Sequence, residues 1–166
     1  MIVNGVSTTI VGVAPRGFLL FVGRLVPEKG CHFLLEAHRR LDLDLPVVVV
    51  GDSSHSDDYV SGLRAAAGPR VIFAGVVTGE RLADLFARAL VVVHPSEREG
   101  MSLVLLEAMG QGACVLASDI PEMLEGVGGA GYHFAHGDAA DLAARLRRLL
   151  DDPAAIDAVR APAAAR

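Results

Sequence analysis

Short apolar runs with no in-and-out alternation recur along this chain, and they constrain its fold more than any other feature. Each run is rich in Val, Ile, Leu or Phe and is stopped by Gly, Pro or Ser. Such a strand is apolar on both faces, which is typical of a parallel sheet covered by helices on both sides. The runs occupy 18–22, 46–51, 70–75, 90–95 and 113–118, with a weaker one at 131–134.

The segments between these runs have the periodicity of helices. Strand and helix in strict succession predict an α/β fold, with a single Rossmann-like doubly wound parallel sheet flanked by helices. We interpret residues 1–16 as a lead-in segment and 17–166 as one domain, with a tail after Pro153 that forms a helix interrupted by Pro162. The expected helices are 32–41, 57–68, 79–89, 102–111 and 139–152.

Charge and cysteine usage exclude several classes of protein. The net charge of −5 argues against nucleic acid as a partner, because no basic stripe is present to displace counterions. Cys31 and Cys114 are far apart and lack the spacing of metal ligands, so we expect reduced thiols and a cytoplasmic location. No apolar run reaches the roughly 18 residues of a membrane span.

The segment EREGMSLVLLEAMGQG, residues 97–112, predicts a binding site. Glu99 precedes an expected helix and Glu107 lies on its second turn, so two carboxylates flank one helix start. Helix N-termini attract phosphates, which a carboxylate would repel, and we therefore expect these glutamates to bind another group, such as sugar hydroxyls. The plainer alternative is a solvated Glu99 in a loop and a Glu107 on the helix surface.

Loops that follow strands are where ligands bind in such sheets. The loop after the first run contains Arg24 and Lys29 between two glycines, and this pair can clamp a diphosphate or can simply be solvated. Val76 and Val77 follow the third run and can either lie against a flat ring or form an ordinary turn.

The combination of these motifs resembles one family. In chain order the motifs are Gly23-Arg24-Leu25 with Lys29-Gly30, Phe73-Ala74-Gly75, Pro95-Ser96 with Glu99-Gly100, and Leu105-Leu106-Glu107-Ala108-Met109. Together they look like the donor-binding half of the family-4 retaining glycosyltransferases, which have the GT-B fold. The resemblance runs from about Asn4 to about Pro153.

The resemblance implies a role for each matching residue. Arg24 and Lys29 would neutralise the diphosphate of a UDP- or GDP-sugar, and Glu99 would hydrogen-bond the transferred sugar, which makes these three the catalytic candidates. Glu107 would accept hydrogen bonds from the ribose hydroxyls. No metal and no other cofactor are expected, because the two cations supply the positive charge. The donor-binding candidates are Gly23, Val76, Val77, Gly100, Met101, Ser102, Leu103 and Glu107.

Two features depart from the family pattern. Met101 and Ser102 replace the more usual aromatic residue and glycine, which alters the expected shape of the sugar pocket. Gly51-Asp52 stands where many members have two glycines, and we interpret the acidic, serine-rich loop that follows as solvated and helix-capping rather than metal-binding. The histidines are interpreted as structural or solvated, and His94 alone lies near the expected crevice.

The resemblance also predicts what this chain works with. Family members have an N-terminal half that binds the acceptor, and we expect that half to act in cis or in trans with this chain. The expected reaction moves a hexosyl group, with retention, to a glycan or lipid-linked glycan in polysaccharide biosynthesis. The chain alone would be inactive, and the other half would provide any peripheral contact with the inner face of the membrane.

Two other functions stay open at this stage. The first is a binding module, or a subunit of a split enzyme, that recognises a nucleotide sugar without turning it over. The second is a glycosidase that uses Glu99 and Glu107 as its carboxyl pair. The clustered cations have no role in the second scheme, which makes it the weaker alternative.

Overall fold

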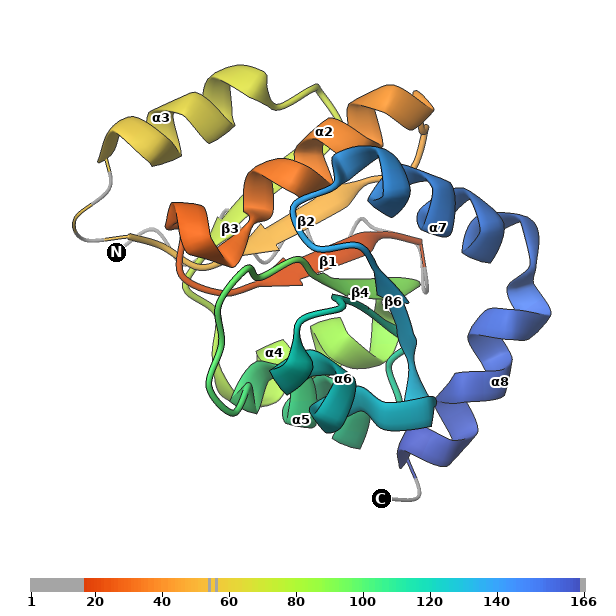
Figure 1. Ribbon diagram of the computed structural model, residues 1–166. Coiled ribbons are helices and arrows are strands. Elements are labelled where there is room, and N and C mark those ends of the chain that lie inside the picture. Colours follow the sequence, from red (N-terminus) through yellow and green to blue (C-terminus); the bar gives the residue numbers. More distant parts are fainter. Residues whose placement is uncertain (1–16, 54, 56, 165–166) are drawn as a thin grey trace.

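A six-stranded parallel sheet forms the centre of the molecule (Figure 1). The computed structural model describes residues 17–53, 55 and 57–164, so the predicted lead-in segment 1–16 lies outside the described residues. The strand order is β3-β2-β1-β4-β5-β6. The strands are β1 (Leu19–Val22), β2 (Val47–Val50), β3 (Val71–Gly75), β4 (Val91–His94), β5 (Val115–Ser118) and β6 (Tyr132–Phe134).

The order of the strands reverses between β1 and β4. Leu19 pairs with Val47 of β2 on one side and with Val91 of β4 on the other, and every strand pair in the sheet is parallel. A reversal of this kind defines the doubly wound topology and leaves a crevice at the carboxyl ends of the two strands. The predicted fold class is therefore confirmed.

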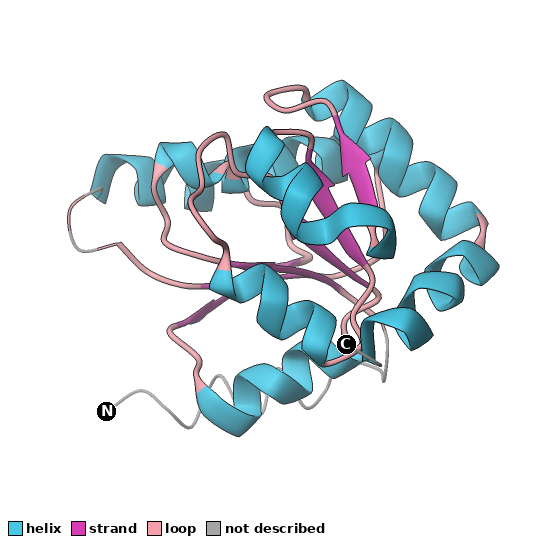
Figure 2. Ribbon diagram, turned by 60° about the horizontal axis from the view of Figure 1, so that its bottom comes forward, coloured by secondary structure: helices cyan, strands magenta, loops and turns pink. Residues whose placement is uncertain are grey.

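Helices cover both faces of the sheet, as Figures 1 and 2 show. One face carries α2, α3 and α7, and the other carries α4, α5 and α6. The α-helices of the described residues are α2 (Cys31–Leu41), α3 (Asp57–Ala66), α4 (Gly79–Arg88), α5 (Leu103–Gly110), α6 (Pro121–Val127), α7 (Ala139–Asp151) and α8 (Pro153–Ala164). Between the layers lie two hydrophobic cores, one on each side of the sheet.

Side chains of single strands alternate between the two cores. Leu20 belongs to the core under α4, α5 and α6, while Leu19 and Phe21 belong to the core under α2, α3 and α7. All three are almost fully buried. Burial on both faces explains why the strand sequences are continuously apolar rather than alternating.

Two helical segments differ from the sequence expectation. α6 was not predicted, because it is only seven residues long and is followed by glycines. α8 continues through Pro162 to Ala164 instead of being interrupted there. Buried Ile156 and Val159 hold α8 against the core, and Pro162 lies in the last turn of the helix.

The thiols of Cys31 and Cys114 are free, as predicted, and both are buried. Burial raises the pKa of each thiol to about 12. Across residues 17 to 164, none of the helices combines the length and apolar character that crossing a bilayer requires.

Candidate functional site

The loop after β1 holds the two predicted cations in different environments. Arg24 is largely exposed and forms an ion pair with Glu28, with Nη2 and Oε1 3.4 Å apart. Lys29 ends η1 (Pro27–Lys29), a single 3-10 turn, and its side chain is only 16% exposed. Lys29 is therefore directed into the protein, toward the crevice, whereas Arg24 lies on its rim.

Gly30 allows this loop to approach the loop after β4. Its φ of 71° lies in the left-handed region, and it both ends η1 and begins α2. A Cβ at this position would clash with the backbone carbonyl of Pro95. The contact is reinforced by a hydrogen bond of 2.9 Å from the Glu97 N–H to the Glu28 carbonyl oxygen. The two loops of the crevice are thus joined through backbone contacts.

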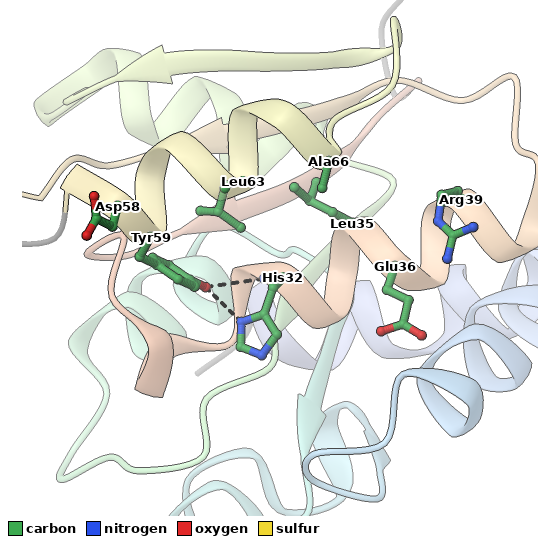
Figure 3. Close-up of a pocket in the computed structure, with 9 residues that line it drawn as sticks. His32, Leu35, Glu36, Arg39, Asp58, Tyr59, Leu63 and Ala66 are labelled. Carbon is green, nitrogen blue, oxygen red and sulfur yellow. Dashed lines mark hydrogen bonds between the residues drawn. The ribbon is translucent and has the colours of Figure 1, made fainter.

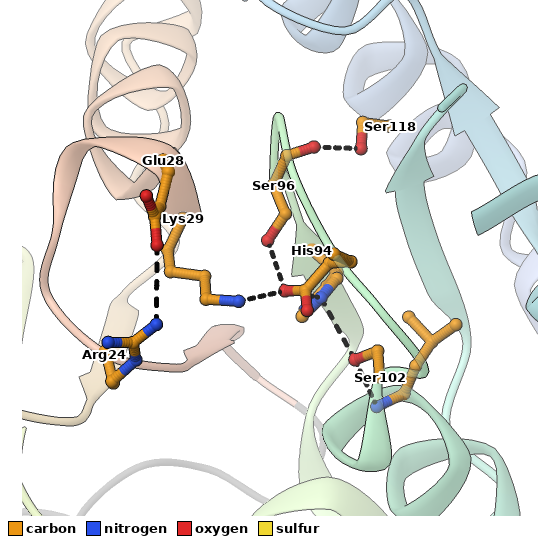
Figure 4. Close-up of polar contacts among 9 residues, drawn as sticks. Arg24, Glu28, Lys29, His94, Ser96, Ser102 and Ser118 are labelled. Atoms are coloured by element: carbon orange, nitrogen blue, oxygen red, sulfur yellow. Dashed lines mark hydrogen bonds and ion pairs between the residues drawn. The ribbon is translucent and has the colours of Figure 1, made fainter. Parts of the chain in front are cut away.

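The predicted carboxylate Glu99 lies at the centre of a polar cluster. Figure 4 labels three of its partners, Lys29, His94 and Ser96. Lys29 Nζ donates to Glu99 Oε1 at 2.7 Å, and Ser96 Oγ donates to the same oxygen at 2.8 Å. His94 Nε2 lies 3.1 Å from that oxygen as well. One carboxylate oxygen is consequently held by groups from β4, from the loop after β4 and from η1.

These contacts determine the protonation state of Glu99. Burial alone would raise the pKa of this carboxyl, but hydrogen bonds from His94, Lys29 and Ser96 outweigh burial and lower the pKa from 4.5 to about 2. Glu99 is therefore ionised at neutral pH, and each of its oxygens can only accept hydrogen bonds.

The start of α5 completes the site. Ser102 is the N-cap residue, and its Oγ accepts a hydrogen bond from the Leu105 N–H at 3.3 Å. The first N–H groups of a helix lack partners within the helix, so this end of α5 carries partial positive charge. It faces the same crevice as Lys29 and Glu99.

A pocket of about 270 Å³ opens at this point, between the carboxyl ends of β1 and β4. It brings together most of the predicted site: Gly23, Arg24, Lys29, Glu99, Met101, Ser102 and Leu103. The other lining residues are Phe21, Val22, His94, Ser96 and Val104.

The remaining predicted residues do not line this pocket. Gly100 lines a neighbouring hollow of about 390 Å³ between α5 and α6. Glu107 is exposed one helical turn beyond Leu103, on the same side of α5. Val76 is 72% exposed, whereas Val77 packs against the core, so a ligand contact at Val77 would use its backbone.

Sequence reasoning gave no binding role to His94 or Ser96. Both are buried, at 4% and 1% exposure, and both contact Glu99. Ser118, at the end of β5, donates to the Ser96 carbonyl oxygen at 2.5 Å and anchors this loop. The sequence feature that could have indicated a role for His94 was its position. His94 is the one polar residue of β4 and lies at the carboxyl end of that strand.

Two further hollows lie away from the crevice, along the groove between α2 and α3. The first, of about 480 Å³, is drawn in Figure 3. There the Tyr59 hydroxyl lies 2.8 Å from His32 Nδ1. The second, of about 510 Å³, shares Leu35, Arg39 and Ala66 with the first. Neither hollow contains any of the predicted site residues.

No group of three or more His, Cys, Asp or Glu side chains suited to hold a metal ion occurs within the described part of the chain. The expectation of a site that works without a metal stays a prediction.

Known proteins resemble this chain in sequence and in fold. The family model for group 1 glycosyl transferases matches residues 16–152. The chain belongs to this family. Among curated relatives of this group 1 glycosyl transferase, sulfoquinovosyl transferase SQD2 of Arabidopsis thaliana is 31% identical over 146 residues, which are 85% of this chain and 28% of the relative. Glycogen synthase of Mycobacterium tuberculosis is 38% identical over 143 residues, which are 82% of this chain and 34% of the relative.

The fold matches solved structures of larger proteins. Anabaena Alr3699/HepE in complex with UDP-glucose superimposes with a TM-score of 0.86 and 26% identity, over 96% of this chain and 46% of HepE. This family member therefore spans about a third of the length of the two curated relatives and less than half of HepE. The match is to GT-B glycosyltransferases, and the chain fits the C-terminal half of that fold.

Proposed function

We propose that this chain is the donor-binding domain of a retaining glycosyltransferase of family 4. The whole protein would move a hexosyl group from a nucleoside diphosphate sugar to a glycan or a lipid-linked glycan. The observation that carries this proposal is the pocket at the β1/β4 crevice, where two cations, an ionised carboxylate and a helix N-terminus meet.

The chemistry of these groups fits a diphosphate and a sugar. Phosphate oxygens accept from Lys29, from Arg24 and from the first N–H groups of α5. Positive charge at this point stabilises the negative charge that develops on the leaving diphosphate as the glycosidic bond breaks. Glu99 is ionised and its side chain is only 9% exposed, so it can accept hydrogen bonds from sugar hydroxyls at the same end of the pocket.

The nucleoside would extend along α5. Leu103 lines the pocket and Glu107 follows it by one turn, about 6 Å along the helix axis. A carboxylate at that distance suits the two ribose hydroxyls, and exposed Val76 suits the base. HepE was solved in complex with UDP and with UDP-glucose, which supports a nucleotide sugar as the ligand of this related fold. No metal is invoked, because Lys29 and Arg24 supply the charge.

The acceptor and the rest of the enzyme are part of the same proposal. The acceptor would be held by an N-terminal GT-B half, supplied in cis or in trans, and this half would provide any contact with the inner face of the membrane. We infer a cytoplasmic reaction in polysaccharide biosynthesis, without nucleic acid as a partner.

A second candidate is a nucleotide-sugar binding module or a subunit of a split enzyme. The observation that favours it is the pocket itself, because its cations, carboxylate and helix start account for binding a nucleotide sugar and do not by themselves provide for an acceptor. The glycosidase alternative finds less support, because Glu107 does not line the pocket that contains Glu99.

Calorimetry with UDP, GDP and ADP tests the donor site. A hydrogen bond to a charged group contributes roughly 2 kcal/mol, so Lys29→Ala should weaken binding of the preferred diphosphate about thirtyfold. The matched control is Arg148→Ala, which removes one positive charge from an exposed position on α7 and should leave the affinity unchanged. A wild-type chain that binds none of the three diphosphates would exclude the donor-site assignment.

A further inference from the structure

His94 occupies an unusual position for a histidine. It is the last residue of β4, after three consecutive valines, and it is 4% exposed. Burying an imidazole costs free energy unless its nitrogens find partners, and an apolar residue of similar size would avoid that cost. The partners of His94 are therefore the feature that needs an explanation.

Nε2 of His94 lies between two groups of the pocket. It is 3.1 Å from Glu99 Oε1 and 3.2 Å from Ser102 Oγ. Because Glu99 is ionised and can only accept, the contact requires a proton on Nε2 of His94. Ser102 is the N-cap of α5, so a single N–H bridges the carboxylate and the helix start.

We infer that His94 is a positioning residue, which donates from Nε2 to Glu99 and thereby fixes this carboxylate relative to the N-terminus of α5. The inference rests on the proposed function, in which Glu99 binds the sugar and the start of α5 binds the phosphate. The distance between these two groups sets how a nucleotide sugar fits.

The other contacts of Glu99 explain why a further fixed donor is needed. Lys29 holds the same oxygen, but a bound diphosphate attracts the lysine and competes for its Nζ. His94 and Ser96 are buried in the strand and loop and stay in place. All of these donors contact Oε1, and no described residue donates to Oε2, which leaves that oxygen for a hydroxyl of the ligand.

The test compares two substitutions in the 166-residue chain, with UDP, GDP and ADP and their glucose conjugates as ligands. His94→Leu removes the donor but keeps an apolar side chain, whereas His94→Gln keeps an amide N–H that can reach Glu99. We expect His94→Leu to weaken nucleotide-sugar binding about tenfold while the diphosphate affinity changes by less than about threefold. His94→Gln should recover at least part of the loss.

His38→Leu is the matched control. His38 is also buried, at 7% exposure, but it lies on α2 and contacts the Leu45 carbonyl oxygen, away from the pocket. Its replacement should leave both affinities unchanged. The inference would be overturned if His94→Leu weakened the binding of diphosphate and nucleotide sugar equally, or did not weaken binding at all. It would also be overturned if His94→Gln restored none of the lost affinity.

A measurement without ligand separates this inference from the proposed function. If the wild type binds no diphosphate, the proposed function fails, and nitrogen NMR of the His94 ring at pH 7 then decides the inference. An Nε2–H tautomer whose ring signals shift in Glu99→Gln supports the contact. An Nδ1–H tautomer, or His94 ring signals that do not change in Glu99→Gln, would overturn the inference.

Discussion

Glu99 has an unusual environment at the residue scale, because this half-buried carboxylate is stabilised by hydrogen-bond donors that all contact one oxygen. The pKa of Glu99 is lowered from 4.5 to about 2 in the folded protein, so ionisation of this carboxyl favours the folded state over the unfolded state. The ionised form stabilises the folded state at every pH above 4.5. This contribution is lost progressively as the pH falls from about 4.5 toward 2.

Glu99→Gln should therefore change the acid sensitivity of the protein. A pKa difference of this size corresponds to about 3 kcal/mol, and the side chain is only 9% exposed, so screening by solvent is limited. The variant should lose about that much unfolding free energy at pH 7, and its stability should fall less than that of the wild type between pH 5 and pH 2. Urea denaturation at a series of pH values measures both quantities.

Glu107→Gln serves as the control for this experiment. Glu107 is exposed and forms no ion pair among the described residues, so its variant should keep the acid sensitivity of the wild type. Parallel pH profiles for Glu99→Gln and the wild type would contradict the stabilised carboxylate.

At the scale of elements, the site depends on how closely two loops approach. Gly30→Ala places a methyl group against the Pro95 carbonyl and forces a left-handed residue to carry a side chain. The cost should be about 2 kcal/mol or more of unfolding free energy. UDP binding should weaken as well, because the loops that hold Lys29 and Glu99 move apart. Urea denaturation and calorimetry measure the two effects.

Gly62→Ala gives the matched comparison. Gly62 lies within α3, where a Cβ would have no neighbouring atom within 4 Å, so alanine should stabilise the helix by about 0.5 to 1 kcal/mol. If Gly30→Ala proved as stable as Gly62→Ala, the close approach of the loops would not be needed for folding.

For the whole molecule, coverage of the relatives leads to a prediction about activity. Transfer requires an acceptor hydroxyl held against the donor, which accounts for a large part of the rate. We expect the 166-residue chain to hydrolyse its donor slowly and to show no transfer above that rate. Joined to an acceptor-binding GT-B half, covalently or as a separate subunit, it should transfer with retention at the anomeric carbon. Product formation from radiolabelled nucleotide sugars measures both.

The two outcomes that contradict this prediction have different meanings. Efficient transfer by the chain alone would show that it binds the acceptor as well as the donor. An assembled pair that binds donor without turnover would favour the nucleotide-sugar binding module.

The sequence by itself determined the fold class and the side of the sheet on which the site lies. Continuous apolar strands are buried on both faces only between two helical layers, and the carboxyl ends of parallel strands lie at one edge of the sheet, so the loops that carry Lys29 and Glu99 were expected to face one crevice. Their direct ion pair, however, depends on Gly30 packing against Pro95, a contact between residues far apart in the chain. Likewise, the apolar pattern of β4 predicts a buried strand whether its last residue is valine or histidine. Only the tertiary structure directed His94 toward Glu99 and Ser102, because hydrogen bonds depend on distances that periodicity does not encode.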